Sequence, residues 1–122
     1  MTTIVFFRDD GGRSPFLGWF TRLSVKAKIQ CRARLQLLAE QGHMLHRPAS
    51  DYLRDGIYEL RARAGRVQYR MLYFFHGREC VVISHGIVKR RADVPPIEID
   101  RALQRKRTYE VAPKQHTHEE AQ

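Results

Sequence analysis

The segment of residues 53–91 constrains the fold of this chain more than any other. It contains three stretches rich in strand-forming residues, 57–62, 67–75 and 80–88, separated by the short turns Ala64-Gly65-Arg66 and His76-Gly77-Arg78. Turns this short join neighbouring antiparallel strands, so the segment predicts a three-stranded β-meander. A meander is stable only when one face is buried, and the rest of the chain is expected to supply the cover.

The flanking segments predict one more strand and three helices. They are a strand over 2–7, a helix that begins at Pro15, a helix over 25–41, a loop over 42–55 and a helix over 97–109. Ser14 and Ser24 each precede a helical pattern with a hydroxyl group that can cap its first turn. Gly42 ends the second helix, because glycine readily adopts the left-handed conformation found after a helix.

The order strand, helix, helix, three strands, helix predicts an α+β fold. We expect a small antiparallel β-meander sheet with an N-terminal helical hairpin and a C-terminal helix packed on one face. The other face is then free to present a polar surface. A chain of 122 residues fits one domain, placed at residues 1–111, and residues 112–122 are expected to form a flexible tail because they lack apolar periodicity.

Positive charge is the most informative feature of the composition. Lys and Arg total 22 against 13 Asp and Glu, which gives a formal net charge of +9. Such an excess favours a polyanionic partner, namely RNA, DNA, the ribosome or an acidic protein, over charge that serves solubility alone.

Other sequence features indicate a cytoplasmic protein without metal or cofactor. No apolar run approaches the ~20 residues of a membrane-spanning helix, and the chain begins without the basic stretch of a signal peptide. Cys31 and Cys80 lie far apart and are interpreted as free thiols in a reducing cytoplasm, although a disulfide between them stays open. His43 and His46 have a metal-like spacing, but no Cys or carboxylate set completes a site. The sequence contains no nucleotide-binding or catalytic-triad motif, so no cofactor is expected.

Alternation along the meander gathers arginine residues on one face of the sheet. Glu59, Arg61 and Arg63 share a face of their strand, and Arg70 lies among apolar residues of the next strand. An arginine buried without a partner is very costly, so an anion is expected to meet Arg70. Two partners stay open at this point: Glu59 in a cross-strand pair, and an RNA phosphate.

More candidates lie along the last strand of the meander. Lys89, Arg90 and Arg91 form a cationic run at the end of that strand, and His85 lies shortly before it. With the arginine residues of the neighbouring strands, these side chains would surround one end of the open sheet face. For His85 a structural role and a catalytic role both stay open, and the structural role is the more common one for a histidine inside a strand.

Four segments of the chain are similar to one protein superfamily. They are DGIYELR at 55–61, YRMLYFF at 69–75, HGIVKR at 85–90, and a helix after a proline pair that carries Glu98, Ile99 and Ala102. Through these four segments, residues 3–109 resemble the RelE/ParE toxin superfamily, in particular the HigB-like, phage-derived toxins of type II toxin–antitoxin systems. Ile87 and Arg90 depart from the family pattern, which often has Phe and Lys at these two positions.

The resemblance implies a toxin that enters the ribosomal A site and cleaves mRNA there, by attack of a ribose 2′-OH on the adjacent phosphate. Carried over by position, Arg61, Arg70 and Lys89 would be catalytic. Arg70 would clamp the scissile phosphate, and the other two would stabilise charge or assist proton transfer. Arginine hardly exchanges protons at pH 7, so His85 or Lys89 is expected to act as the base. The cations that would bind RNA are Arg63, Arg90 and Arg91.

The resemblance also implies partners and a cellular setting. A cognate helix-turn-helix antitoxin, the ribosome and mRNA are the expected partners, all in the cytoplasm, with no membrane and no metal involved. Two alternatives stay open: a non-catalytic, ParE-like inhibitor of DNA gyrase, and a non-toxic phage-derived nucleic-acid-binding protein.

Overall fold

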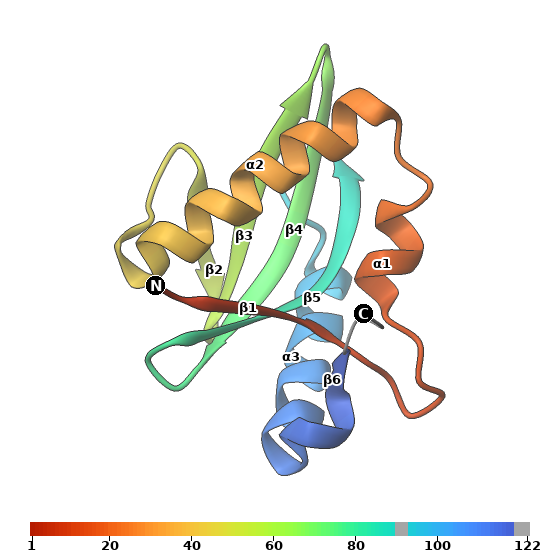
Figure 1. Ribbon diagram of the computed structural model, residues 1–122, viewed down its shortest axis with the longest axis vertical. Coiled ribbons are helices and arrows are strands. Elements are labelled where there is room, and N and C mark those ends of the chain that lie inside the picture. The colour runs from red at the N-terminus through yellow and green to blue at the C-terminus, as the bar shows by residue number, and fades with distance from the viewer. Residues whose placement is uncertain (90–92, 119–122) are drawn as a thin grey trace.

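One six-stranded sheet runs through the computed structural model, with helices on both of its faces (Figure 1). The structure describes residues 1–89 and 93–118. The strands are β1 (Thr3–Phe7), β2 (Ser50–Arg54), β3 (Ile57–Ala64), β4 (Val67–His76), β5 (Cys80–Lys89) and β6 (Thr117–His118), in the spatial order β2-β3-β4-β5-β1-β6. The helices are α1 (Pro15–Phe20), α2 (Val25–Gln41) and α3 (Pro96–Val111), and the short 3-10 turns are η1 (Gly42–Met44) and η2 (Pro113–His116). The predicted α+β fold class is confirmed.

The predicted meander is formed by β3, β4 and β5. β3 and β4 pair antiparallel with Arg61 opposite Arg70, and β4 pairs antiparallel with β5. The two connecting turns contain Gly65 at φ 60° and Gly77 at φ 67°. These left-handed conformations favour glycine, which is why such short connections suffice.

The first two helices begin where the sequence predicts, and α2 also ends where predicted, whereas α1 ends at Phe20. The side chain of Ser14 accepts a hydrogen bond from the backbone N–H of Leu17 at 3.3 Å, and Ser24 accepts one from Ala27 at 3.2 Å. Gly42, with φ 51°, ends α2. Capping satisfies backbone groups that a helix leaves unpaired at its ends, so these boundaries follow from local sequence.

α1 and α2 pack on one face of the sheet, and α3 packs on the other (Figure 1). On β4, Met71 and Tyr73 face the first two helices, whereas Leu72 and Phe74 face α3. The prediction that all helices pack on one face is therefore wrong. The physical reason is that β4 is apolar on both faces, so burial of both faces stabilises the fold.

Three strands lie outside the meander. β1, which the sequence predicts, pairs in parallel with β5. β2 lies within the predicted loop 42–55 and pairs with β3 at one edge of the sheet. Residues 113–118, expected to belong to a flexible tail, instead form η2 and β6, and His116 donates from Nδ1 to the backbone oxygen of Arg8 at 2.8 Å. Residues 119–122 of that predicted tail lie outside the described residues.

Three further expectations concern the chain as a whole. No helix within residues 1–89 and 93–118 is long and apolar enough to cross a membrane. Cys31 and Cys80 are both free, and burial raises the pKa of the Cys31 thiol to about 11. The assignment of residues 1–111 to a single domain stays a prediction.

Gly86 allows a test of the packing between α1 and β5. The indole ring of Trp19, the only tryptophan of the chain, lies against Gly86, where an added Cβ atom would collide with it. We expect Gly86→Ala to lower the free energy of unfolding by about 2 kcal/mol, because overpacking displaces neighbouring side chains. Urea unfolding followed by Trp19 fluorescence measures this change. In the control Gly18→Ala on α1 the new methyl group meets no atom within 4 Å, so equal unfolding midpoints for the two variants would contradict this packing.

Candidate active site

The predicted catalytic cations gather on the face of the sheet that carries α3, beyond the part that α3 covers. Arg61 on β3 lies opposite Arg70 on β4, and Lys89 on β5 lies opposite Gln68 on β4. α3 packs on the apolar end of the same face, which includes Leu72. The three cations, called the cation cluster below (Arg61, Arg70 and Lys89), therefore lie on neighbouring strands at one end of one face.

A buried carboxylate holds the two arginine side chains of the cation cluster. Glu59 on β3 is only 2% exposed, and its Oε1 accepts a hydrogen bond from Arg61 Nε at 2.7 Å. The same oxygen lies 3.4 Å from Arg70 Nε. Arg61 also donates from Nη2 to Asp51 on β2 at 3.2 Å. Of the two partners left open for Arg70 by the sequence, the structure contains the cross-strand carboxylate.

Arg70 is oriented by its own strand as well as by Glu59. Its Nη1 donates to the backbone oxygen of Tyr69 at 3.2 Å, and its Nη2 donates to Gln68 at 2.9 Å. Burial lowers the pKa of Arg70, the charge of Glu59 opposes this, and the charge of Arg61 adds to it. Among the described residues, Arg70 Nε and Glu59 Oε2 have no hydrogen-bond partner. Both atoms are buried, so an anion would approach Arg70 through the terminal nitrogens of its fixed guanidinium, which needs little reorganisation.

Lys89 is the member of the cation cluster best suited to proton transfer. It ends β5 and is partly exposed. Burial lowers the pKa of Lys89, the charge of Glu59 opposes this, and the charges of Arg70 and Arg61 add to it. A lysine with a lowered pKa gives up its proton more readily near neutral pH.

His85 bonds to α3 rather than to the cation cluster. Its ring is buried, with Nδ1 2.8 Å from Ser84 Oγ and Nε2 3.2 Å from Glu98 Oε1 on α3. A neutral ring satisfies both contacts by accepting from Ser84 and donating to Glu98. Burial lowers the pKa of His85 to about 4, Arg105 lowers it too, and Glu98 opposes both. The structure therefore does not bring His85 together with the three cations.

The predicted RNA-binding cations are only partly described. Arg63 is exposed, shares the face of Arg61, and donates from Nε to the backbone oxygen of Gly65 at 2.8 Å. Arg90 and Arg91 lie outside the described residues. A role of these residues in RNA binding stays a prediction.

Comparison with models of known protein families identifies the family of this chain. Residues 18–107, more than half of the chain, match the family model described as phage-derived protein Gp49-like. The chain belongs to the Gp49-like family. This family is associated with RelE-like toxins of toxin–antitoxin systems. No curated protein matches the sequence.

The part of the chain that matches Gp49-like proteins includes the candidate site. It runs from α1 into α3 and contains Glu59 and the cation cluster, whereas β1, η2 and β6 lie outside it. At this level the family agrees with the resemblance to toxins noted in the sequence. The narrower assignment to HigB-like toxins stays a prediction.

Asp51 and Gln68 form hydrogen bonds with the cation cluster of this Gp49-like protein, but the sequence alone did not identify either as a site residue. Asp51 lies in the segment predicted as a loop, and its contact with Arg61 exists only because β2 pairs with β3. Gln68 lies two positions before Arg70, so alternation places both on one face of the strand, but the sequence interpretation gave Gln68 no role at the site.

The histidine pair noted as a metal candidate lies elsewhere. His43 stacks on Phe75, with the ring centroids 3.7 Å apart, and His46 bonds the backbone oxygen of Arg47 through Nδ1 at 2.8 Å. Within residues 1–89 and 93–118 no group of three or more His, Cys, Asp or Glu side chains is arranged to hold a metal ion.

The pKa of His85 makes the stability of this Gp49-like protein depend on pH. The folded pKa of about 4 lies below the ordinary value of 6.5, so between these values the unfolded chain binds more protons. The stability that neutral His85 contributes is complete above about pH 6.5 and is lost as the pH falls towards 4. Over this interval the free energy of unfolding should drop by roughly 3 kcal/mol more in wild type than in His85→Gln. Urea unfolding at a series of pH values measures this difference, and parallel profiles would contradict it.

Proposed function

We propose that this protein is the toxin of a type II toxin–antitoxin system and cleaves mRNA on the ribosome. One observation carries the proposal: Arg61, Arg70 and Lys89 lie on neighbouring strands of one face around a buried carboxylate. Cations fixed in one place suit the stabilisation of charge that develops on a phosphate. Membership of the Gp49-like family, which is associated with RelE-like toxins, supports the same class of function.

The reaction starts with attack of the ribose 2′-oxygen on the adjacent phosphorus atom. The bond from phosphorus to the 5′-oxygen then breaks, which leaves a 2′,3′-cyclic phosphate and a 5′-hydroxyl group. We assign Arg70 to the scissile phosphate, because a planar guanidinium can bond two phosphate oxygens at once. Arg61 supplies a second charge. Glu59 is a positioning residue, since it contacts both guanidinium groups.

Lys89 is assigned to proton transfer. The 2′-hydroxyl must lose a proton, and the departing 5′-oxygen must gain one. The neutral form of Lys89 takes the first proton and the resulting ammonium returns it to the leaving group; a lowered pKa makes this form accessible. His85 is less suited, because it is buried and both ring nitrogens are engaged.

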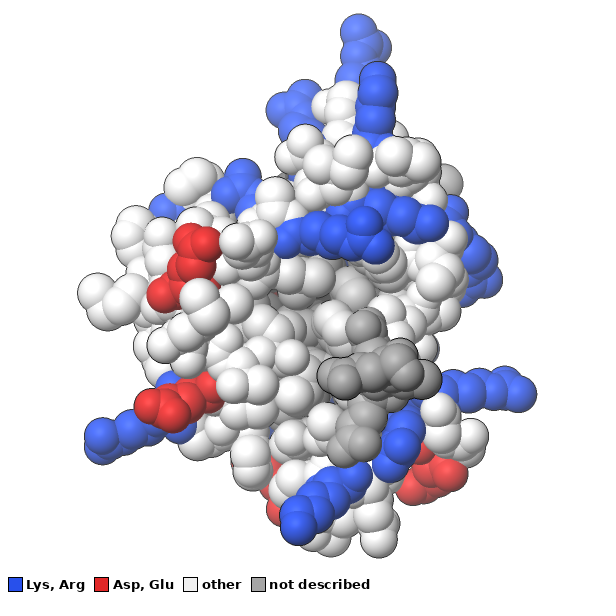
Figure 2. Space-filling view, viewed as in Figure 1, with Lys and Arg blue, Asp and Glu red and all other residues white. Residues whose placement is uncertain are grey.

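Basic side chains on the face that carries α2 suit a partner made of RNA. Figure 2 shows Lys and Arg side chains gathered along α2 and above it, where β3 and β4 turn. α2 contributes Lys26, Lys28, Arg32 and Arg34, with no acidic residue before Glu40. Cations in the first turn of a helix oppose its dipole, so their presence there favours a polyanionic partner. Ribosomal RNA would surround the toxin in the cytoplasm, where mRNA is its substrate and a helix-turn-helix antitoxin its inhibitor.

Induced expression separates this proposal from its alternatives. Cells that express the protein should stop growing, and their mRNAs should acquire new 5′ ends inside translated codons. Mapping of mRNA 5′ ends measures this outcome. DNA damage with intact mRNA would instead indicate a ParE-like inhibitor of DNA gyrase, and undiminished growth would indicate a non-toxic nucleic-acid-binding protein.

A further inference from the structure

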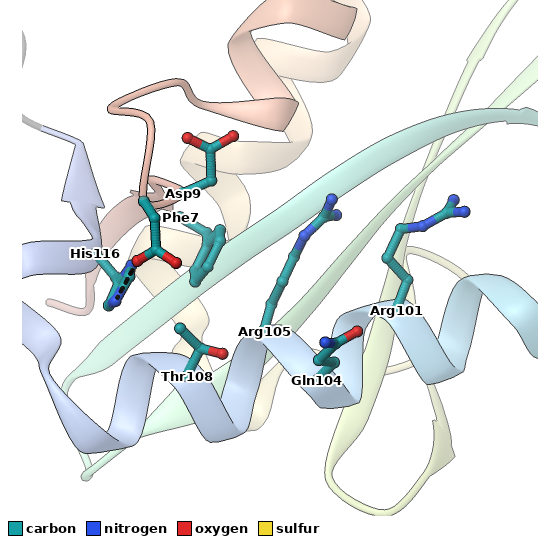
Figure 3. A pocket seen from close by; sticks show the side chains of 8 residues that line it. Phe7, Asp9, Arg101, Gln104, Arg105, Thr108 and His116 are labelled. Carbon is teal, nitrogen blue, oxygen red and sulfur yellow. Dashed lines mark ion pairs between the residues drawn. The ribbon is translucent and has the colours of Figure 1, made fainter.

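A cavity of about 290 Å³ lies between α3, the end of β1 and η2, outside the cation cluster (Figure 3). One wall is a polar stripe on α3, formed by Arg101, Gln104, Arg105 and Thr108. Their spacing of three and four residues places them on one side of the helix, and Figure 3 shows the two arginine side chains extending from α3 on the same side. The apolar side of α3 packs against the sheet instead. The stripe therefore directs hydrogen-bond donors into the cavity.

Arg105 has no anionic partner in the described part of the chain. It is half-buried, and the only hydrogen bond of its side chain to a described residue goes to Ser84 Oγ at 3.3 Å. Its guanidinium lies 5.9 Å from the ring centroid of Phe7, and it forms no ion pair with a described carboxylate. Burial lowers the pKa of Arg105, the charge of Arg101 adds to this, and acidic residues only partly offset it. An anion brought into the cavity would relieve the cost of this buried charge.

The opposite wall carries an aromatic stack and two carboxylates. Phe7 and His116 stack with ring centroids 5.5 Å apart and ring planes within 3°. Asp10 Oδ1 lies 3.7 Å from His116 Nε2, and Asp9 accepts a hydrogen bond at 2.9 Å from a backbone N–H of its own loop. The cavity thus has donors on α3 and acceptors on the loop after β1.

We propose that this cavity binds the phosphate group of a nucleotide, either free or within an RNA strand. Arg105 holds the phosphate, and Arg101, which pairs with Glu98 Oε1 at 2.6 Å, adds positive charge beside it. A phosphate offers more acceptor oxygens than a carboxylate, which suits the four donor side chains of the stripe. The ribose hydroxyl groups of a nucleotide donate hydrogen bonds, for which Asp9 and Asp10 are acceptors. Because the site is separate from the cation cluster, binding here does not depend on RNA cleavage.

Nuclear magnetic resonance titration of the full-length protein tests this site without ribosomes. Adenosine 5′-monophosphate should shift the signals of residues 101–108 and His116 in a saturable way, inorganic phosphate should do so more weakly, and acetate should not. Arg105→Gln should weaken nucleotide binding about tenfold through loss of a charge-assisted contact, and the more exposed Arg101→Gln should act in the same direction. Arg107→Gln is the matched control, because Arg107 is exposed on the same helix outside the stripe.

Further ligands and variants decide the source of the phosphate and the location of the site. A dinucleotide of RNA that binds at least about tenfold more tightly than the mononucleotide would identify an RNA strand as the ligand, and equal affinity would identify a free nucleotide. The proposal is overturned if neither phosphate compound gives saturable shifts, if acetate binds equally well, or if Arg105→Gln and Arg107→Gln lose affinity equally. It is also overturned if Arg70→Ala abolishes nucleotide binding while Arg105→Gln retains it, since the nucleotide would then occupy the cation cluster.

Discussion

Replacing Arg70 by alanine should slow mRNA cleavage by at least about a hundredfold and abolish growth arrest. Loss of one preorganised donor to a developing negative charge costs about two to three orders of magnitude in rate. Contacts with Gln68, with the backbone of Tyr69 and with Glu59 fix the orientation of the Arg70 guanidinium before the substrate binds. Primer extension on mRNA from induced cells measures the effect.

Two further variants show what Arg70 contributes. Arg70→Lys keeps the charge but loses the planar fork, so it should retain only part of the activity. Arg78→Ala removes an exposed charge in the turn between β4 and β5, far along the sheet from the cation cluster, and should remain toxic. Since Arg70 is only 7% exposed, urea unfolding must show that Arg70→Ala still folds. Full toxicity of the folded variant would contradict the role assigned to Arg70.

Replacing Glu59 by alanine should lower the free energy of unfolding by about 3 kcal/mol. The change leaves Arg61 and Arg70 opposite each other on neighbouring strands without the carboxylate between them. Removal of one partner from a buried ion pair costs about 3–5 kcal/mol, and the low end applies because the side chain of Arg61 is 31% exposed. Urea unfolding at neutral pH measures this loss.

Controls for Glu59 separate the ion pairs from charge in general. Glu79→Ala removes an exposed carboxylate in the turn before β5 and should stay within about 0.5 kcal/mol of wild type. The double variant Glu59→Ala/Arg70→Ala should lose less than the sum of the single variants, with a coupling energy of about 1 kcal/mol or more. Additive losses, or wild-type stability of Glu59→Ala, would contradict a carboxylate that holds the cluster.

The sequence predicts those parts of the fold that depend on local interactions. Ser24 and Gly42 set the ends of α2 because capping involves only nearby backbone groups. The meander follows from short turns and alternation. The side on which α3 packs does not follow, because Leu72 and Phe74 on one face of β4 are as apolar as the residues on its other face. β2 and β6 are short and polar, so only pairing with a neighbouring strand reveals them.

The candidate site follows the same rule. Period-two alternation places Arg61 and Glu59 on one face, and the pairing of β3 with β4 brings Arg70 to them. The environment of His85 depends on where α3 crosses the sheet, and no local sequence pattern encodes that crossing. The hydrogen bond between His85 and Glu98 therefore cannot be predicted from the sequence. The donors of the α3 stripe are visible in the sequence, but the cavity they line exists only because β1 and η2 meet α3.

Purified protein added to ribosomes that carry a defined mRNA gives the most direct test of ribosome-dependent cleavage at the cation cluster. With the wild-type protein, primer extension should reveal a cut within the codon in the A site, and the upstream fragment should end in a 2′,3′-cyclic phosphate. No cut should form without ribosomes or with folded Arg70→Ala. An mRNA that stays intact on ribosomes with the wild-type protein, or that is cut equally by Arg70→Ala, would contradict this function.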